Sequence, residues 1–128
     1  MATWRIEFPD DGAYVLIVVS ATASLRDFVD ALHEYQQRPE FRAGMDALWD
    51  LTDAALDISA DQVREAVAVY GELLEERGTG HRVAYVVARE VDYGVLRMYE
   101  AYAGGLPYTT GVFKTLADAR AFLGARPA

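Results

Sequence analysis

One stretch decides the fold of this chain: Met45-Asp46-Ala47-Leu48-Trp49-Asp50-Leu51-Thr52-Asp53. Its apolar residues form a run of strand length, which is typical of a strand buried inside a sheet. Thr52 and Asp53 turn the pattern polar, and a long helix opens near Ser59. The stretch therefore predicts a buried strand that exits into a polar loop, and we expect any working site at that exit.

Apolar periodicity on both sides of this stretch predicts further strands. Residues 4–8 alternate apolar and polar side chains, as in an edge strand, and residues 14–19 are continuously apolar, as in an interior one. Pro9-Asp10-Asp11-Gly12 supplies turn chemistry between them, so the pair reads as a hairpin. Residues 82–88 and 110–113 complete the set of predicted strands.

Four helices are predicted from capping residues followed by apolar stripes of helical spacing. The helix from Ser24 has one apolar face and ends before Pro39. The helix from Ser59 has the clearest stripe, and Asp92 is predicted to cap a third helix. The fourth begins near Thr115. The stripes of the first two helices consist of Leu25, Phe28, Val29, Leu32 and Tyr35, and of Val63, Ala66, Val67, Tyr70, Leu73 and Leu74.

The expected order of elements is ββαβαβαβα. Strands alternating with helices predict an α/β fold, with a mostly parallel five-stranded sheet, an antiparallel first edge strand and four helices. A length of 128 residues is typical of one domain, which we place at residues 1–124, with 125–128 as a short tail. In such sheets ligands bind where strands end and helices begin.

Composition excludes several classes of function. The formal net charge of −8 argues against binding to nucleic acid, which needs clustered Lys and Arg. The charge is uneven, because residues 1–77 carry six Arg against sixteen acids, whereas residues 78–128 carry a net charge of +2. No cysteine is present, and no apolar run approaches the length of a membrane span. We therefore expect a cytoplasmic protein.

No catalytic or metal-binding motif of high specificity occurs in the sequence. Asp50, Asp53 and Asp57 cluster after the central strand, but their spacing matches no EF-hand loop. His33 and His81 have no partner residue at a spacing typical of a triad or a zinc site, and we expect both at the surface or its boundary. We expect no metal, no cofactor, no catalytic residue and no enzymatic activity.

Tyrosines crowd the third predicted helix and the loop after it. This set can be core with its hydroxyls reaching water, a partner interface, or the wall of an apolar-ligand pocket. Arg89 and Arg97 flank it, and a guanidinium is well suited to a phosphate or carboxylate. The candidate residues for a ligand or an interface are Arg89, Tyr93, Arg97, Met98, Tyr99, Tyr102 and Tyr108.

Three segments carry a resemblance to a known family. They are residues 82–87, then Tyr93-Gly94-Val95-Leu96-Arg97-Met98-Tyr99-Glu100, and then residues 112–119 with Phe122-Leu123. With these segments the chain resembles the SpoIIAA-like group of STAS domains, which includes anti-sigma-factor antagonists and is often described together with CRAL-TRIO lipid-binding domains. The resemblance covers nearly the whole chain and implies a bacterial binding module of that fold.

The resemblance also points to a regulatory loop. In anti-sigma-factor antagonists, a kinase phosphorylates a serine at the start of the helix after the central strand, within an Asp-Ser-Ser-Gly motif, and this abolishes partner binding. The matching segment here is Asp57-Ile58-Ser59-Ala60-Asp61, in which only Ser59 corresponds. The implied regulatory or partner loop consists of Thr52, Asp53, Asp57 and Ser59.

Two functions follow from the sequence. The leading one is a non-enzymatic module that acts through protein-protein contact, along the Thr52 to Val63 edge or the tyrosine-rich helix, or through self-association. The alternative is a small apolar or lipid-like ligand bound between the Ser59–Arg77 and Asp92–Tyr102 helices, with Arg97 or Arg89 at its polar end.

Overall fold

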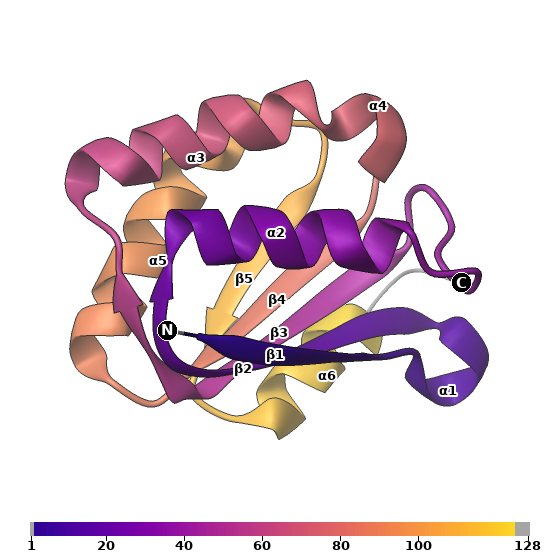
Figure 1. Ribbon diagram of the computed structural model, residues 1–128, viewed down its shortest axis with the longest axis horizontal. Helices are drawn as coiled ribbons and strands as arrows, with labels where there is room; N and C mark the ends of the chain where they lie inside the picture. The colour runs from indigo at the N-terminus through magenta and orange to yellow at the C-terminus, as the bar shows by residue number, and fades with distance from the viewer. Residues whose placement is uncertain (1, 125–128) are drawn as a thin grey trace.

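The fold is taken from a computed structural model, which describes residues 2–124 (Figure 1). The predicted tail at 125–128 therefore lies outside the described residues. The strands are β1 (Thr3–Glu7), β2 (Tyr14–Ser24), β3 (Asp46–Asp57), β4 (Arg82–Val87) and β5 (Thr109–Phe113). The helices are α1 (Pro9–Gly12), α2 (Leu25–Gln36), α3 (Ala60–Glu72), α4 (Leu74–Arg77), α5 (Glu90–Tyr102) and α6 (Leu116–Gly124), with a 3-10 turn η1 at Ala103–Gly105.

Within residues 2–124 the strands form a five-stranded sheet in the order β1-β2-β3-β4-β5. β1 runs antiparallel to β2, and each later pair of neighbours is parallel. Parallel neighbours need a crossover, and α2, α3 with α4, and α5 provide the three crossovers. This arrangement confirms the predicted α/β fold and the antiparallel first edge strand.

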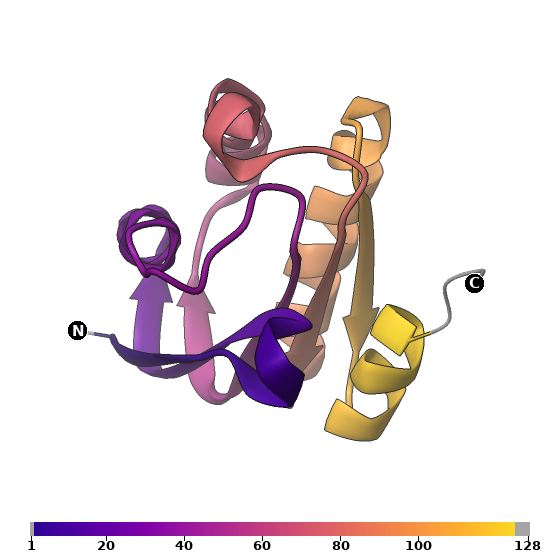
Figure 2. The same ribbon diagram turned by 90° about the vertical axis from the view of Figure 1, so that its right-hand side faces the viewer.

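The helices cover the two faces of the sheet unequally. The larger apolar core lies between the sheet and α2, α3 and α5, and it includes Trp49 and Tyr85. α6 packs on the opposite face, where Ala119 and Leu123 lie in a smaller core with Leu48 (Figure 2). Successive side chains of a strand point to opposite faces, so β3 and β4 contribute to both cores.

β3 is the interior strand that the sequence predicts. It lies between β2 and β4, and its first half pairs with both. Trp49 and Leu51 face the larger core and Leu48 faces the smaller one, and all three are buried.

Two predicted boundaries are wrong, because β2 and β3 both continue further than expected. Their register shifts between Val18 and Ser20, and parallel pairing then resumes as far as Ser24 with Asp57. Ala21 has a positive φ of 68° beside this irregularity. The residues after Leu51 that the sequence assigns to a loop therefore lie in the strand, where pairing with β2 satisfies backbone groups that a loop would expose to water.

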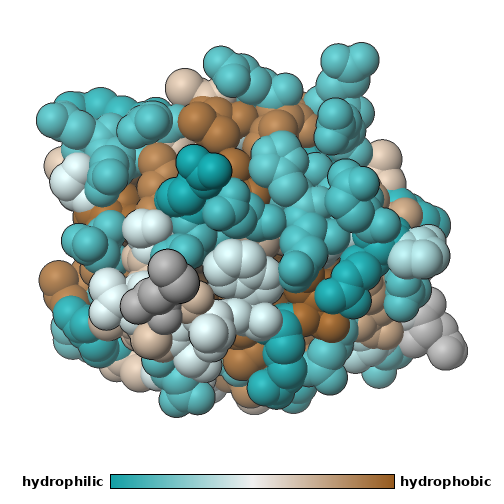
Figure 3. Space-filling model, in the orientation of Figure 1, coloured by the Kyte–Doolittle hydropathy of each residue, from teal (hydrophilic) through white to brown (hydrophobic). Residues whose placement is uncertain are grey.

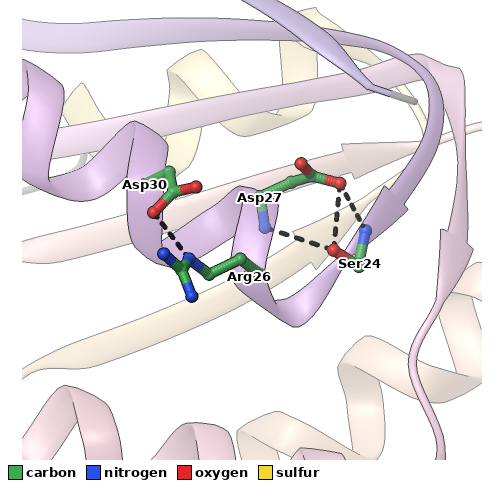
Figure 4. A network of polar contacts seen from close by, with 4 residues as sticks. All are labelled: Ser24, Arg26, Asp27 and Asp30. Atoms are coloured by element: carbon green, nitrogen blue, oxygen red, sulfur yellow. Dashed lines mark hydrogen bonds and ion pairs between the residues drawn. The ribbon is translucent and has the colours of Figure 1, made fainter.

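The capping boxes predicted from the sequence are present. Ser24 accepts a hydrogen bond from the backbone N–H of Asp27, and the Asp27 carboxylate accepts from the backbone N–H of Ser24 (Figure 4). Ser59 and Gln62 make the same reciprocal pair at the start of α3. Each box satisfies N–H groups that a helix leaves unpaired at its first turn.

Three short elements add to the four predicted helices. The turn expected at Pro9–Gly12 is a single helical turn, α1. The helix predicted over 59–77 divides at Leu73 into α3 and α4, and η1 follows α5. These elements leave the order of strands and main helices unchanged.

The predicted cap of α5 is wrong. α5 begins at Glu90, and Arg89 occupies the N-cap without a side-chain capping bond. Asp92 is instead buried in the first turn, where its carboxylate accepts a hydrogen bond from the backbone N–H of Leu56, 3.3 Å away. The extension of β3 to Asp57 places the Leu56 N–H within reach of this carboxylate.

Gly78 fixes the end of α4 against the loop before β3. Its φ of +91° is a conformation that side chains rarely adopt, and a Cβ atom there would lie 2.1 Å from the backbone nitrogen of Gly44. We expect Gly78→Ala to lower the free energy of unfolding by about 1–3 kcal/mol. Gly94→Ala is the matched control, because nothing lies within 4 Å of its Cβ position in α5, and it should raise stability by up to about 1 kcal/mol. Urea unfolding measures both, and equal stability of Gly78→Ala and the native protein would contradict this account.

Candidate functional site

An apolar groove lies on the face of the sheet that carries the larger core, between α2, α3 and α5. We call it the α2–α3–α5 groove. Its volume is about 80 Å³, several times the roughly 10–15 Å³ that one water needs on the same measure. Its walls are almost entirely apolar, and they include Leu25, Phe28, Leu32, Ala66, Leu73 and Val95, with Trp49 and Tyr85 from the sheet.

The apolar stripe of α3 packs against the larger core but is only partly buried. Val63 is its buried residue, whereas Ala66, Val67 and Tyr70 are only half-buried. The helix packs chiefly beside α5 and stands away from the sheet, as Figures 1 and 2 show. Apolar surface is accordingly visible over α3 among hydrophilic side chains (Figure 3). An amphipathic helix normally buries such a stripe, so the groove is a place where packing is incomplete.

A cluster of tyrosines, of which Tyr70 is half-buried and Tyr99 and Tyr108 are buried, continues from the groove into the core. The Tyr70 hydroxyl lies 3.0 Å from Nε2 of His81, and the ring of Tyr108 stacks on both, at 4.6 Å from Tyr70 and 5.0 Å from His81. The hydroxyls of Tyr99 and Tyr108 are hydrogen-bonded. The prediction that His81 lies at the surface or its boundary is wrong, because these rings enclose it and it is 0% exposed. His33 is exposed, as expected.

The predicted ligand-contacting residues divide between groove and surface. Tyr99 lines the groove, and Tyr108 is buried behind it. Arg97 points elsewhere: it forms an ion pair with Glu100 at 3.2 Å and donates to the Tyr93 hydroxyl. Arg89 pairs with Asp92, at 3.6 Å. Neither arginine is among the lining residues, so their positions give no support to a role at the polar end of a ligand in this groove.

The exposed side of α5 carries a second apolar feature, which we call the α5 outer face. It consists of Val91, Met98 and Tyr102, which are 57%, 36% and 45% exposed. Their spacing of seven and four residues places them on one side of the helix. Arg64 of α3 lies over the Tyr102 ring, 5.4 Å from its centroid.

The predicted regulatory loop is part strand and part helix cap. Thr52, Asp53 and Asp57 belong to β3, and only Ser59 lies beyond it. Ser59 is exposed, and its hydroxyl already caps α3. A phosphate on Ser59 would replace that capping bond, and the carboxylate of neighbouring Asp61 would oppose it.

The sequence reasoning missed Arg77. This side chain is fully buried, and its Nε donates a hydrogen bond to the Tyr35 hydroxyl at 2.7 Å. One signal was available in the sequence, because Arg77 continues the apolar stripe of α3 through Tyr70 and Leu73 at helical spacing. A charged residue in register with an apolar stripe indicates either a boundary position or a buried charge.

No group of three or more His, Asp or Glu side chains that could hold a metal ion occurs among the residues that the structure describes. No helix in the same part of the chain has the length and apolar character needed to cross a membrane.

The buried tyrosines predict a loss of stability at alkaline pH. Burial raises the pKa of Tyr70 to about 12, and it also raises the pKa values of Tyr35, Tyr85, Tyr99 and Tyr108 above 10.0. Between pH 10 and the raised values the unfolded chain has lost these protons and the native state keeps them. The free energy of unfolding therefore falls as pH rises, by up to about 1.4 kcal/mol per pH unit for each such tyrosine.

Urea unfolding at increasing pH measures this slope. Tyr70→Phe should make it shallower, whereas Tyr102→Phe, a change at an exposed ring, should leave it as it is. A slope that responds equally to both substitutions would show that buried phenols do not cause it.

Comparisons with known proteins identify the fold. No protein-family model matches the sequence, and no curated protein does. Among solved structures, the chain is similar to an uncharacterised protein of the DUF3478 family with a SpoIIAA-like fold from Shewanella loihica PV-4. The match has a TM-score of 0.59 and 18% sequence identity, and it covers 95% of this chain and 93% of the other. The chain therefore has the SpoIIAA-like fold that its motifs predict.

Proposed function

We propose that this protein is a non-enzymatic binding module that takes a small apolar ligand in the α2–α3–α5 groove. The observation that carries the proposal is the half-buried stripe of α3 above an apolar hollow. A ligand there would bury apolar surface that the protein alone leaves incompletely covered. The sequence predicts a ligand between the Ser59–Arg77 and Asp92–Tyr102 helices as the alternative function. The groove lies between these helices, and α2 adds a third wall.

The size and chemistry of the groove define the ligand class. Leu25 and Leu32 both line it and are seven residues apart on α2, which corresponds to about 10 Å along the helix. A linear chain of about eight carbons has that length, and each buried methylene contributes about 0.8 kcal/mol. The expected ligand is therefore a short aliphatic chain, bound with modest affinity after the costs of association.

Support for the non-enzymatic part of the proposal comes from the lining side chains. Among the described residues, the polar groups on the groove walls belong to tyrosines and Trp49. Burial raises the pKa values of Tyr70, Tyr85 and Tyr99, so these phenols keep their protons at neutral pH and are not available as general bases.

Trp49 lines the groove and can report its occupancy by fluorescence. In a Trp4→Phe background, which leaves Trp49 as the single tryptophan, 1-octanol should change the emission saturably. Ala66→Phe should abolish the response, because Ala66 lines the groove and a phenyl ring would occupy it. Ala68→Phe is the matched control, since Ala68 is exposed on the same helix, and it should bind like the background protein.

A response that survives Ala66→Phe, or the absence of any response, would contradict the proposal. Native mass spectrometry of the purified protein tests for a natural ligand that co-purifies with it, without any added probe. A co-purifying apolar molecule present with Ala68→Phe and missing with Ala66→Phe would place the natural ligand in the groove.

A second candidate function is self-association through the α5 outer face, one form of the contact function that the resemblance implies. The observation that favours it is the exposure of Val91, Met98 and Tyr102 on one side of one helix. Aromatic residues and Met are enriched in protein interfaces, and a few of them commonly supply most of the binding energy.

Sedimentation equilibrium tests this candidate. The native protein should show a concentration-dependent dimer, which Met98→Glu should weaken by about tenfold or more because it places a charge in the apolar contact. Ala68→Glu adds the same charge at an exposed position on α3 and should dimerise like the native protein. A native protein that remains monomeric at high concentration would exclude self-association.

A further inference from the structure

Arg77 is the least expected buried group in the molecule. It is 0% exposed and lies on α4, immediately after α3. Its guanidinium lies over the rings of Tyr35 and Phe41, at 5.5 and 5.6 Å from their centroids, and Nε donates to the Tyr35 hydroxyl. Aromatic faces attract a cation, so this environment stabilises the charge in part.

Most of the hydrogen-bonding capacity of Arg77 is unused. Within residues 2–124, no Asp or Glu forms an ion pair with the side chain. The Tyr70 hydroxyl lies close enough to interact with the guanidinium, but neither Nη1 nor Nη2 makes a hydrogen bond of regular geometry. Arginine does not lose its proton in proteins, so burial here means burial of a charge. Such a charge is costly unless an anion compensates it. The two free nitrogens of a guanidinium form a fork that matches a carboxylate.

The guanidinium lies just past one end of the α2–α3–α5 groove. On α2, Tyr35 follows the groove residue Leu32 by three positions, and Arg77 follows Leu73 by four. Both steps are about one helical turn. Tyr70 and Tyr85 line the groove, and although burial raises their pKa values, the positive charge of Arg77 acts on both in the opposite direction. The charge is therefore within electrostatic reach of the groove wall.

We propose that the groove ligand carries a carboxylate at one end, and that Arg77 receives this group while the aliphatic chain lies along the groove. The inference rests on the proposed function of the groove and adds the polar end of its ligand. Tyr70 contacts both places, because it lines the groove and lies beside Arg77 and His81. Because Arg77 is fully buried and does not itself line the groove, the proposed binding mode requires the Tyr70 ring to move aside when the carboxylate enters.

Arg77 differs from the arginines that the sequence favoured for this role. Arg97 and Arg89 are exposed and already paired with carboxylates of the protein. A carboxylate from a ligand would have to displace those partners in water, where ion pairs contribute little. At Arg77 it would meet a desolvated cation that has no competing anion.

Two probes with chains of equal length distinguish the contribution of the carboxylate to binding from that of the aliphatic chain. Octanoate and 1-octanol are titrated at neutral pH into the Trp4→Phe protein, and Trp49 fluorescence reports binding. Octanoate should bind about tenfold more tightly, because a charge-assisted bidentate hydrogen bond is among the strongest polar contacts in proteins. Arg77→Met should remove this preference, so that octanoate and 1-octanol bind with similar affinity. Arg97→Met is the matched control and should keep the preference.

Each outcome decides a separate point. Equal affinities of the Trp4→Phe protein for the two probes would overturn the role of Arg77 and leave the groove proposal intact. If neither probe changes the Trp49 emission, the groove proposal fails, and the role of Arg77 fails with it. Should Arg77→Met not fold, Arg77→Lys replaces it, since it keeps the charge and loses the fork. The preference for octanoate should then fall severalfold, and an undiminished preference would overturn the inference.

Discussion

The pairing of β2 with β3 is the constraint on which the rest of the structure depends. It continues to Ser24 with Asp57, whereas β4 stops pairing with β3 at Val87, opposite Leu51. The last six residues of β3, about 20 Å of strand, therefore project past the neighbouring strand. α3 begins from the end of this projection and returns beside α5, not flat on the sheet (Figure 2). The groove is the space that this route leaves beneath α3.

The same projection leaves backbone N–H groups of β3 without a neighbouring strand on the side of β4. Two carboxylates accept hydrogen bonds from these groups instead. Asp50 accepts from the N–H of Thr52 at 3.1 Å, and Asp92 accepts from the N–H of Leu56. Each bond satisfies an N–H group in the part of β3 that extends past β4. The second bond also ties the first turn of α5 to β3. A single buried aspartate thus protects the edge and sets one wall of the groove.

Local patterns in the sequence predict the strands, main helices and capping boxes, because each depends on residues a few positions apart. The projection of β3 was not predictable, since Ala54 to Asp57 lack clear alternation and pair with β2 only after a shift in register at Val18. The burial of His81 likewise depends on rings from α3 and from the loop before β5. The sequence shows that Arg77 continues the apolar stripe of α3, but only the structure shows that no Asp or Glu side chain within residues 2–124 forms an ion pair with it.

The two ends of α3 are held by different kinds of contact. Beyond its C-terminal end, the carbonyl of Arg77 accepts from the N–H of Gly44 at 2.8 Å, and Gly78 packs directly on the same backbone. At its N-terminal end the helix is held by the capping box of Ser59 and Gln62 and by Val63, the buried residue of α3. In the binding mode proposed above, the carboxylate of the ligand would rest at the other end, where the backbone contact with Gly44 fixes the position of Arg77.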